Sequence, residues 1–200
     1  MNPGISRLGD HVICPLVAAS RLDRPKLRDR LTRARGRFLI LSAFFVAAFA
    51  SASDILIDVL YDDRYSLAAL MVPVMAIATW FGILSTLSEA ILLGLGRPAV
   101  AAGANAVKLL ILVLAAPAVM PIYGLAAVLL VFVLIEMVRY GTLAFSMWRE
   151  GLAFPTQDVF FTVILIGLTV AFRALLERLG AGSGVDALWF GDGAWALLAR

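Results

Sequence analysis

The sequence predicts an all-α protein, a polytopic transmembrane bundle of about five membrane-spanning helices. Of its 200 residues 62% are hydrophobic and only 16% are charged, whereas soluble domains are about half apolar and a quarter charged. The mean hydropathy is +0.95. The charges are confined between apolar runs of the length that a helix needs to cross a bilayer. These runs lack the apolar–polar alternation of a membrane β-barrel, so we expect helices.

Five apolar runs qualify as spans, at residues 38–61, 66–95, 98–120, 122–148 and 158–179. Pro73 is expected to kink the second span, and Pro98 occupies a favoured first-turn position of the third. The connections are short, namely DDR at 62–64, GR at 96–97, MP at 120–121 and REGLAFPTQ at 149–157. Successive spans are therefore expected to be antiparallel neighbours.

Charge distribution divides the chain into a basic N-terminal segment and linker (1–37), the bundle (38–179) and a Gly-rich tail with aromatic residues suited to the membrane interface (180–200). Eight of the 17 basic residues lie between Arg21 and Arg37. By the positive-inside rule we expect a multi-pass membrane protein with a cytoplasmic N-terminus. We expect the basic side chains to contact anionic lipid, not nucleic acid: Arg28, Arg30, Arg33, Arg35 and Arg37.

The sequence contains no motif typical of an enzyme or of a metal site. His11 and Cys14 form a single HVIC pair with no second pair of ligands, so no metal site is expected. HExxH, GxSxG and phosphate-cradling loops are absent from the sequence. We therefore expect no cofactor and no catalytic residues. A membrane glycosyltransferase would need a large outer loop, whereas the expected outer turns are a few residues long.

Polar residues inside the spans are the strongest functional signal, because each charge at the centre of a span costs about 2.5–3.5 kcal/mol. Stripes of Ser and Thr accompany these charges, and we expect the polar faces to meet one another or a hydrated cavity. Asp54 and Asp58 form a further stripe near the expected outer end of the first span. The candidates for a transport path are Glu89, Asn105, Lys108, Glu136 and Arg139.

Lys108 is the only charge between Arg97 and Glu136. Counted from the outer turn near residue 121, Lys108 lies about 12 residues back and Glu136 about 14 forward, so their depths agree within roughly 3 Å. We predict a Lys108–Glu136 contact that leaves Arg139 freer to meet an anionic headgroup. Two alternatives are that Glu136 and Arg139 neutralise each other at i, i+3 spacing, and that Lys108 and Glu89 extend toward the cytoplasmic surface.

The order of several short motifs resembles the polysaccharide (O-antigen and exopolysaccharide) flippases of the multidrug/oligosaccharidyl-lipid/polysaccharide transporter superfamily. The motifs are YDDRYSLA, the cytoplasmic turn GLGRP, the Asn-containing GANAV and the outer turn PIYGLAAV, spread over residues 20–150. Asp62–Asp63 stands where that family usually has a glycine, and the last motif lacks a second glycine.

The resemblance implies a flippase for lipopolysaccharide or exopolysaccharide biosynthesis. Its substrate would be an undecaprenyl-diphosphate-linked glycan, moved by alternating access between two lobes. Cationic residues in the cavity would suit the diphosphate. The chain would be a C-terminal portion that is inactive without its N-terminal lobe or another polysaccharide-export protein. Alternatives are a drug or lipid exporter of the same superfamily and a non-transporting subunit of a polysaccharide-export complex.

Overall fold

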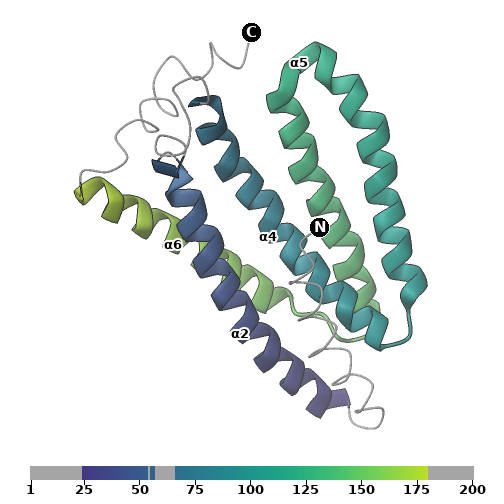
Figure 1. Cartoon of the computed structure of the whole chain (residues 1–200). Coiled ribbons are helices and arrows are strands. Elements are labelled where there is room, and N and C mark those ends of the chain that lie inside the picture. The colour runs from purple at the N-terminus through teal and green to yellow at the C-terminus, as the bar shows by residue number, and fades with distance from the viewer. Residues whose placement is uncertain (1–23, 54, 57–65, 180–200) are drawn as a thin grey trace.

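The computed structural model describes residues 24–53, 55–56 and 66–179. Four helices follow one another in this part of the chain: α2 (Arg24–Ser51), α4 (Ser66–Gly94), α5 (Pro98–Arg149) and α6 (Pro155–Arg178). α5 folds back on itself at Gly124, its one non-helical residue. We call residues 98–123 its first arm and residues 125–149 its second arm (Figure 1). The described residues thus contain five helices long and apolar enough to cross a membrane, which confirms the predicted fold class.

Helix bounds agree with the prediction for α4 and differ for α2. α2 begins at Arg24, so the boundary expected between residues 37 and 38 lies inside a continuous helix. Arg, Lys and Leu are good helix formers, and the helix runs through the basic segment for that reason. The candidate span of α2 is Arg28–Ser51. Asp54, Asp58 and the other residues of 57–65, which include the DDR turn, lie outside the described residues, as do residues 1–23 and 180–200.

Three glycines with positive φ set the turns. Gly96 ends α4, where the Arg97 N–H donates to the Leu92 carbonyl and the Gly96 N–H to the Leu93 carbonyl, the pattern of a Schellman cap. Gly151 ends α5 with the same pair of hydrogen bonds. The outer turn expected at Met120–Pro121 instead lies at Gly124, whose φ of 72° and ψ of −169° are essentially restricted to glycine.

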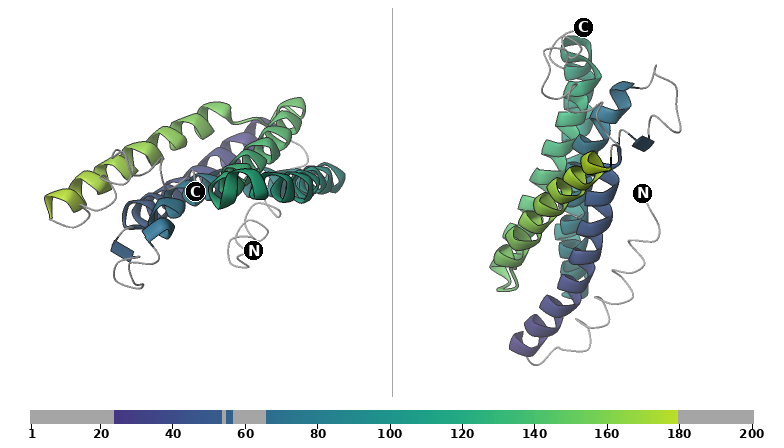
Figure 2. Two further views of the ribbon diagram at one scale, coloured as in Figure 1. Left: turned by 90° about the horizontal axis from the view of Figure 1, so that it is seen from above. Right: turned by 90° about the vertical axis from the view of Figure 1, so that its left-hand side faces the viewer.

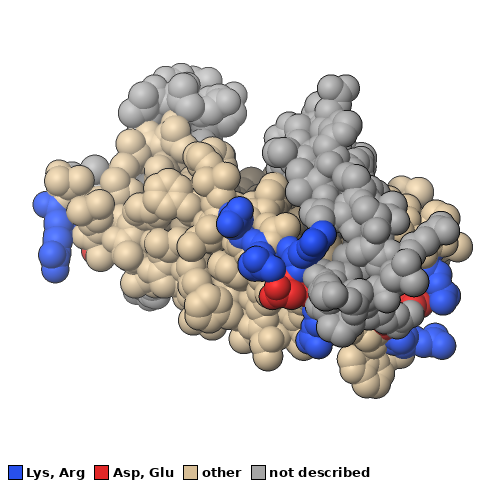
Figure 3. Space-filling model, turned by 90° about the horizontal axis from the view of Figure 1, so that it is seen from below, with Lys and Arg blue, Asp and Glu red and all other residues tan. Residues whose placement is uncertain are grey.

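The start of α2, the turn at Gly96–Arg97 and the loop at residues 150–154 lie together at one end of the bundle, which we call the basic end (Figure 1). Arg97 pairs with Glu150 at 2.9 Å, and Arg28 Nη2 donates to the Ala153 carbonyl at 3.5 Å. Figure 3 views the molecule from this end, where Lys and Arg side chains project from the surface. The positive-inside rule predicts these three segments on one side of the membrane, and in the structure they lie at the same end of the bundle.

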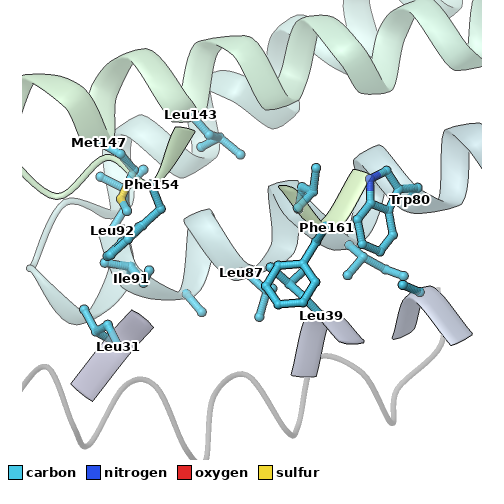
Figure 4. Packing of buried hydrophobic residues seen from close by; sticks show 14 of the residues in the cluster. Leu31, Leu39, Trp80, Leu87, Ile91, Leu92, Leu143, Met147, Phe154 and Phe161 are labelled. Atoms are coloured by element: carbon cyan, nitrogen blue, oxygen red, sulfur yellow. The ribbon is translucent and has the colours of Figure 1, made fainter. Parts of the chain in front are cut away.

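The buried core joins α2, α4, α5 and α6 (Figure 4). α2 buries every fourth residue, among them Leu31, Leu39 and Ala43, so one narrow stripe faces its neighbours. Trp80 of α4 is 1% exposed and donates to Thr162 Oγ1 of α6 at 2.9 Å. Figure 2 shows that α6 crosses α2 obliquely and that its C-terminal end splays away from both arms of α5.

Candidate functional site

The residues predicted as a transport path come together in one cluster, the central charge network. It connects α4 with both arms of α5, so three helical segments meet at it. Two carboxylates face two cations, and one amide completes the set. Its members are Glu89, Asn105, Lys108, Glu136 and Arg139.

The predicted contact between Lys108 and Glu136 is confirmed: Lys108 Nζ pairs with Glu136 Oε1 across the two arms of α5. Arg139 joins the remaining groups, with its Nη2 2.5 Å from Glu89 Oε2 and its Nη1 3.5 Å from Glu136 Oε2. Asn105 Nδ2 donates to Glu89 Oε1 at 3.0 Å. Each carboxylate therefore has two partners, and the formal charges of the network cancel.

Arg139 corrects one expectation. The sequence suggested that a Lys108–Glu136 pair would leave Arg139 freer to meet a ligand, yet Arg139 is 9% exposed and paired with both carboxylates. The intrahelical Glu136–Arg139 pair therefore exists alongside the interhelical one. Within the described residues the buried Nε of Arg139 has no hydrogen-bond partner, so one donor of the guanidinium stays unused.

Lys108, Glu136 and Arg139 lie near the middle of their spans, whereas Glu89 lies five residues before the end of α4 at Gly94. Lys108 is ten residues from Pro98 and Arg139 is ten residues from Arg149, so each lies about 15 Å along its helix from the basic end. The hydrocarbon core of a bilayer is about 30 Å thick. Glu136 is 9% exposed, whereas the Lys108 side chain is 30% exposed and Asn105 is also exposed. The network is therefore buried on one side and open on the side of the first arm.

Gly82 on α4 leaves room for the Glu136 carboxylate. A Cβ at this position would lie 3.7 Å from Glu136 Oε2 and 3.8 Å from its Cδ. A methyl group fits at this distance, but a longer side chain would meet the carboxylate. The absence of a side chain at Gly82 therefore lets the Glu136 carboxylate lie close to the backbone of α4.

The Ser and Thr stripes do not extend the network. Thr86 donates to the carbonyl of Gly82, and Ser85 and Ser88 donate to carbonyls four residues earlier in α4. Ser146 likewise donates to the carbonyl of Thr142. These hydroxyls are satisfied by their own helices, which is a common fate of Ser and Thr inside a membrane helix. The expectation that the polar stripes meet one another holds for the charged residues and the amide.

A second buried cluster overturns the prediction for Arg35. Arg28, Arg30, Arg33 and Arg37 are exposed, as expected of cations at a membrane surface. Arg35 is 2% exposed and its Nη2 lies 2.7 Å from Asp158 Oδ1 of α6. Arg35 occupies the i+4 stripe that α2 buries, and an ion pair satisfies its charge there.

Tyr140 and Asp158 complete this Arg35 cluster, and neither was predicted from the sequence as a site residue. Tyr140 Oη donates to Asp158 Oδ2 at 2.6 Å. The one sequence feature that could have indicated this cluster is Asp158, an acidic residue at the start of an apolar run. An acidic residue in a first helical turn is usually explained by its interaction with the helix dipole. Arg35 was equally inconspicuous among neighbouring arginines. Only the packing of α2 against α6 shows that they meet.

Arg139 and Tyr140 are consecutive residues of the second arm, yet they belong to different clusters. Arg139 contacts Glu89 of α4, and Tyr140 contacts Asp158 of α6. Successive residues on a helix point about 100° apart, so one turn of this arm connects the central charge network with the Arg35 cluster.

Within the described residues, no group of three or more His, Cys, Asp or Glu side chains is arranged to hold a metal ion. Comparison with protein-family models, curated proteins and solved structures finds no match to the chain.

Proposed function

We propose that this chain is the substrate-binding part of a flippase for lipid-linked oligosaccharides in the bacterial inner membrane. The observation that carries the proposal is the central charge network, which places Lys108 and Arg139 about halfway through the spans. Charges at this depth are expensive and mark transport paths more often than they serve packing alone. The order of the sequence motifs supports the same function.

The chemistry of the network suits the diphosphate of an undecaprenyl-diphosphate-linked glycan. Ammonium and guanidinium groups bind phosphate oxygens through charge-assisted hydrogen bonds. Without substrate, Glu89 and Glu136 neutralise the two cations. A diphosphate entering from the open side would compete with the carboxylates for Lys108, whose side chain is 30% exposed. Because the diphosphate would replace a carboxylate as the anionic partner, each cation would stay paired throughout the exchange.

The open side of the network indicates what lies next to the bundle. Asn105 and Lys108 expose polar atoms at a depth where lipid offers them no hydrogen bonds. In a two-lobed transporter this side would face a cavity between the lobes. The bundle supplies one wall of that cavity, and we expect it to transport only with an N-terminal lobe or with another polysaccharide-export protein.

The basic end would face the cytoplasm and its anionic lipids. Exposed arginines of α2 lie there together with Arg97 and Arg149. Each cation near an anionic membrane surface contributes about 1 kcal/mol of attraction. This orientation would open the transport path first to the leaflet in which lipid-linked glycans are assembled.

One observation favours a second candidate, an exporter of cationic drugs or lipids. The network holds as many carboxylates as cations, so Glu89 and Glu136 could bind a cation in place of Arg139 and Lys108. A non-transporting subunit of an export complex would use the same contacts for packing alone.

The decisive experiment replaces Lys108 with Met and Glu136 with Gln together, in the organism that encodes this chain. The double variant removes one cation and one anion, so the network stays neutral and the protein should insert normally. We expect surface polysaccharide to fall and the lipid-linked repeat unit to accumulate in the cytoplasmic leaflet. Arg97→Gln, at a loop ion pair, is the matched control. Normal polysaccharide with altered drug resistance would favour the exporter, and no change in either would leave a packing role.

A further inference from the structure

A pocket of about 150 Å³ lies at the basic end, between the end of α5 and the start of α6. It is partly open to the outside, and its wall is almost entirely apolar. The side chains that form the apolar wall are Ala144, Met147, Trp148, Ala153, Phe154 and Pro155. Figure 4 shows Met147 and Phe154 next to each other.

The polar residues at this pocket turn little of their surface into it, because its wall is almost entirely apolar, although Arg35 Nε and Asp158 Oδ1 are buried without a hydrogen-bond partner. Arg35 and Asp158 form their ion pair, and Tyr140 donates to Asp158. The guanidinium of Arg35 also lies over the Phe154 ring, 5.3 Å from its centroid. The occupant must therefore be apolar. An apolar cavity of about 150 Å³ accommodates a group the size of benzene, so a short stretch of hydrocarbon chain fits and a large soluble ligand does not.

The rim of the pocket is cationic. Arg28 is exposed, and its Nη2 is 3.5 Å from the carbonyl of Ala153 while its Cζ is 6.0 Å from the Phe154 ring centroid. Arg149, which follows the lining residue Trp148 in the sequence, is exposed, and the next residue, Glu150, is paired with Arg97. The N-terminus of α6, which adds partial positive charge, begins at Pro155. An apolar pocket with a cationic rim at the end of membrane-spanning helices matches one class of molecule, an anionic phospholipid.

We propose that this pocket is a specific site for one anionic phospholipid, which inserts a stretch of acyl chain beside Trp148 while Arg28 holds its phosphate group. The site is separate from the central charge network and does not depend on the proposed transport activity. It also differs from general attraction of the basic end to the bilayer, because it requires the apolar wall as well as the charge.

The test measures retention of phosphatidylglycerol and phosphatidylcholine with identical acyl chains, by native mass spectrometry of the purified full chain. We expect one phosphatidylglycerol molecule to be retained about five-fold better than phosphatidylcholine. Ala144→Phe, which fills the pocket, and Arg28→Gln, which removes the rim charge, should each abolish this preference. The matched controls are Val163→Phe on the exposed face of α6 and Arg37→Gln on the exposed face of α2; both should retain it.

A second measurement uses the wild-type chain, so that it does not depend on how Ala144→Phe folds. Brominated phosphatidylglycerol should quench tryptophan fluorescence more than brominated phosphatidylcholine at the same mole fraction, and Trp148→Phe should remove the excess. Equal retention and equal quenching by the two lipids would overturn the proposal. So would a preference that Arg28→Gln abolishes but Ala144→Phe leaves intact, because that result would describe a charged surface without a pocket.

Discussion

Lys108 and Glu136 are 28 residues apart in the chain and form an ion pair across the two arms of α5. The pair lies near the middle of both spans, and Arg139 contacts the second oxygen of the same carboxylate. Glu136 is thus shared between two cations, one from each arm. This arrangement ties the two arms of the hairpin together near the middle of their spans.

Removal of one partner from this pair should cost more than removal of both. Lys108→Met leaves a net negative charge in the network, and we expect the free energy of unfolding to fall by about 2 to 3 kcal/mol. This loss is at the low end of the range for breaking a buried ion pair, because the Lys108 side chain is 30% exposed. Lys108→Met combined with Glu136→Gln should recover most of it. Chemical denaturation in detergent micelles measures the difference, and equal losses in the single and double variants would contradict the pairing.

Gly82 should tolerate a methyl group and reject a larger side chain. A Cβ at Gly82 would lie 3.7 Å from Glu136 Oε2, an ordinary contact, so Gly82→Ala should leave stability unchanged or slightly higher. Gly82→Leu should displace the carboxylate and cost about 1–3 kcal/mol. Gly103→Leu is the control, since nothing lies within 4 Å of a Cβ there. Thermal unfolding of the three variants separates the cases; similar effects of Leu at both positions would argue against the contact.

Arg35 and Arg37 should respond differently to the same substitution. Arg35→Met leaves Asp158 buried without its cation, and we expect a loss of about 3–5 kcal/mol in unfolding free energy. Arg37→Met removes an exposed charge and should change stability little. Denaturant titration of both variants in the same detergent provides the comparison. A mild effect at Arg35 would mean that α2 and α6 do not depend on this ion pair.

Gly124 should resist substitution even though space is available around it. Nothing lies within 4 Å of a Cβ at this position, so a steric clash with neighbours is not the obstacle. Its φ of 72° and ψ of −169° cost other residues about 1–3 kcal/mol. Gly124→Ala should lower the melting temperature, whereas Gly103→Ala, inside the first arm, should not. If both variants melted alike, the two arms would have to be connected by a different backbone conformation.

Cysteine labelling should place the basic end on the cytoplasmic side. In a Cys14→Ser background, single cysteines at Arg30 and Arg97 should react with an impermeant thiol reagent only after the membrane is opened. A cysteine at Leu125, next to the turn at Gly124, should react in intact cells. Reaction of Arg30 and Arg97 positions from outside would invert the topology that the arginine distribution predicts.

The number and type of the helices could be predicted because they follow from one-dimensional properties. Apolar length and the absence of alternation are enough to specify membrane helices. Turn positions were less predictable: Pro121 looked like a break, yet the helix passes through it and reverses at Gly124. The turn depends on which residue can adopt positive φ, and proline within a membrane helix is often accommodated.

Some contacts of the central charge network could also be predicted from the sequence, and others could not. Lys108 and Glu136 could be paired by counting residues from a common turn, because antiparallel helices share a depth scale. The partner of Arg139 on α4 could not be predicted by counting residues in this way. Glu89 belongs to α4, and the sequence does not determine which face of α4 is turned toward α5. Arg35 was predicted as a surface residue because its neighbours are arginines; its burial depends on a four-residue stripe that only the packing of α2 defines.

The succession of Arg139 and Tyr140 has a consequence for movement. If the second arm of α5 turned about its axis to release Arg139 from Glu89, the same rotation would carry Tyr140 away from Asp158. The two contacts lie on different sides of the arm and join different neighbours, so a rotation that releases one contact also breaks the other. The arm therefore has one orientation that satisfies both contacts. An event at the central charge network would then be felt at the Arg35 cluster, because consecutive residues of one arm make the two contacts.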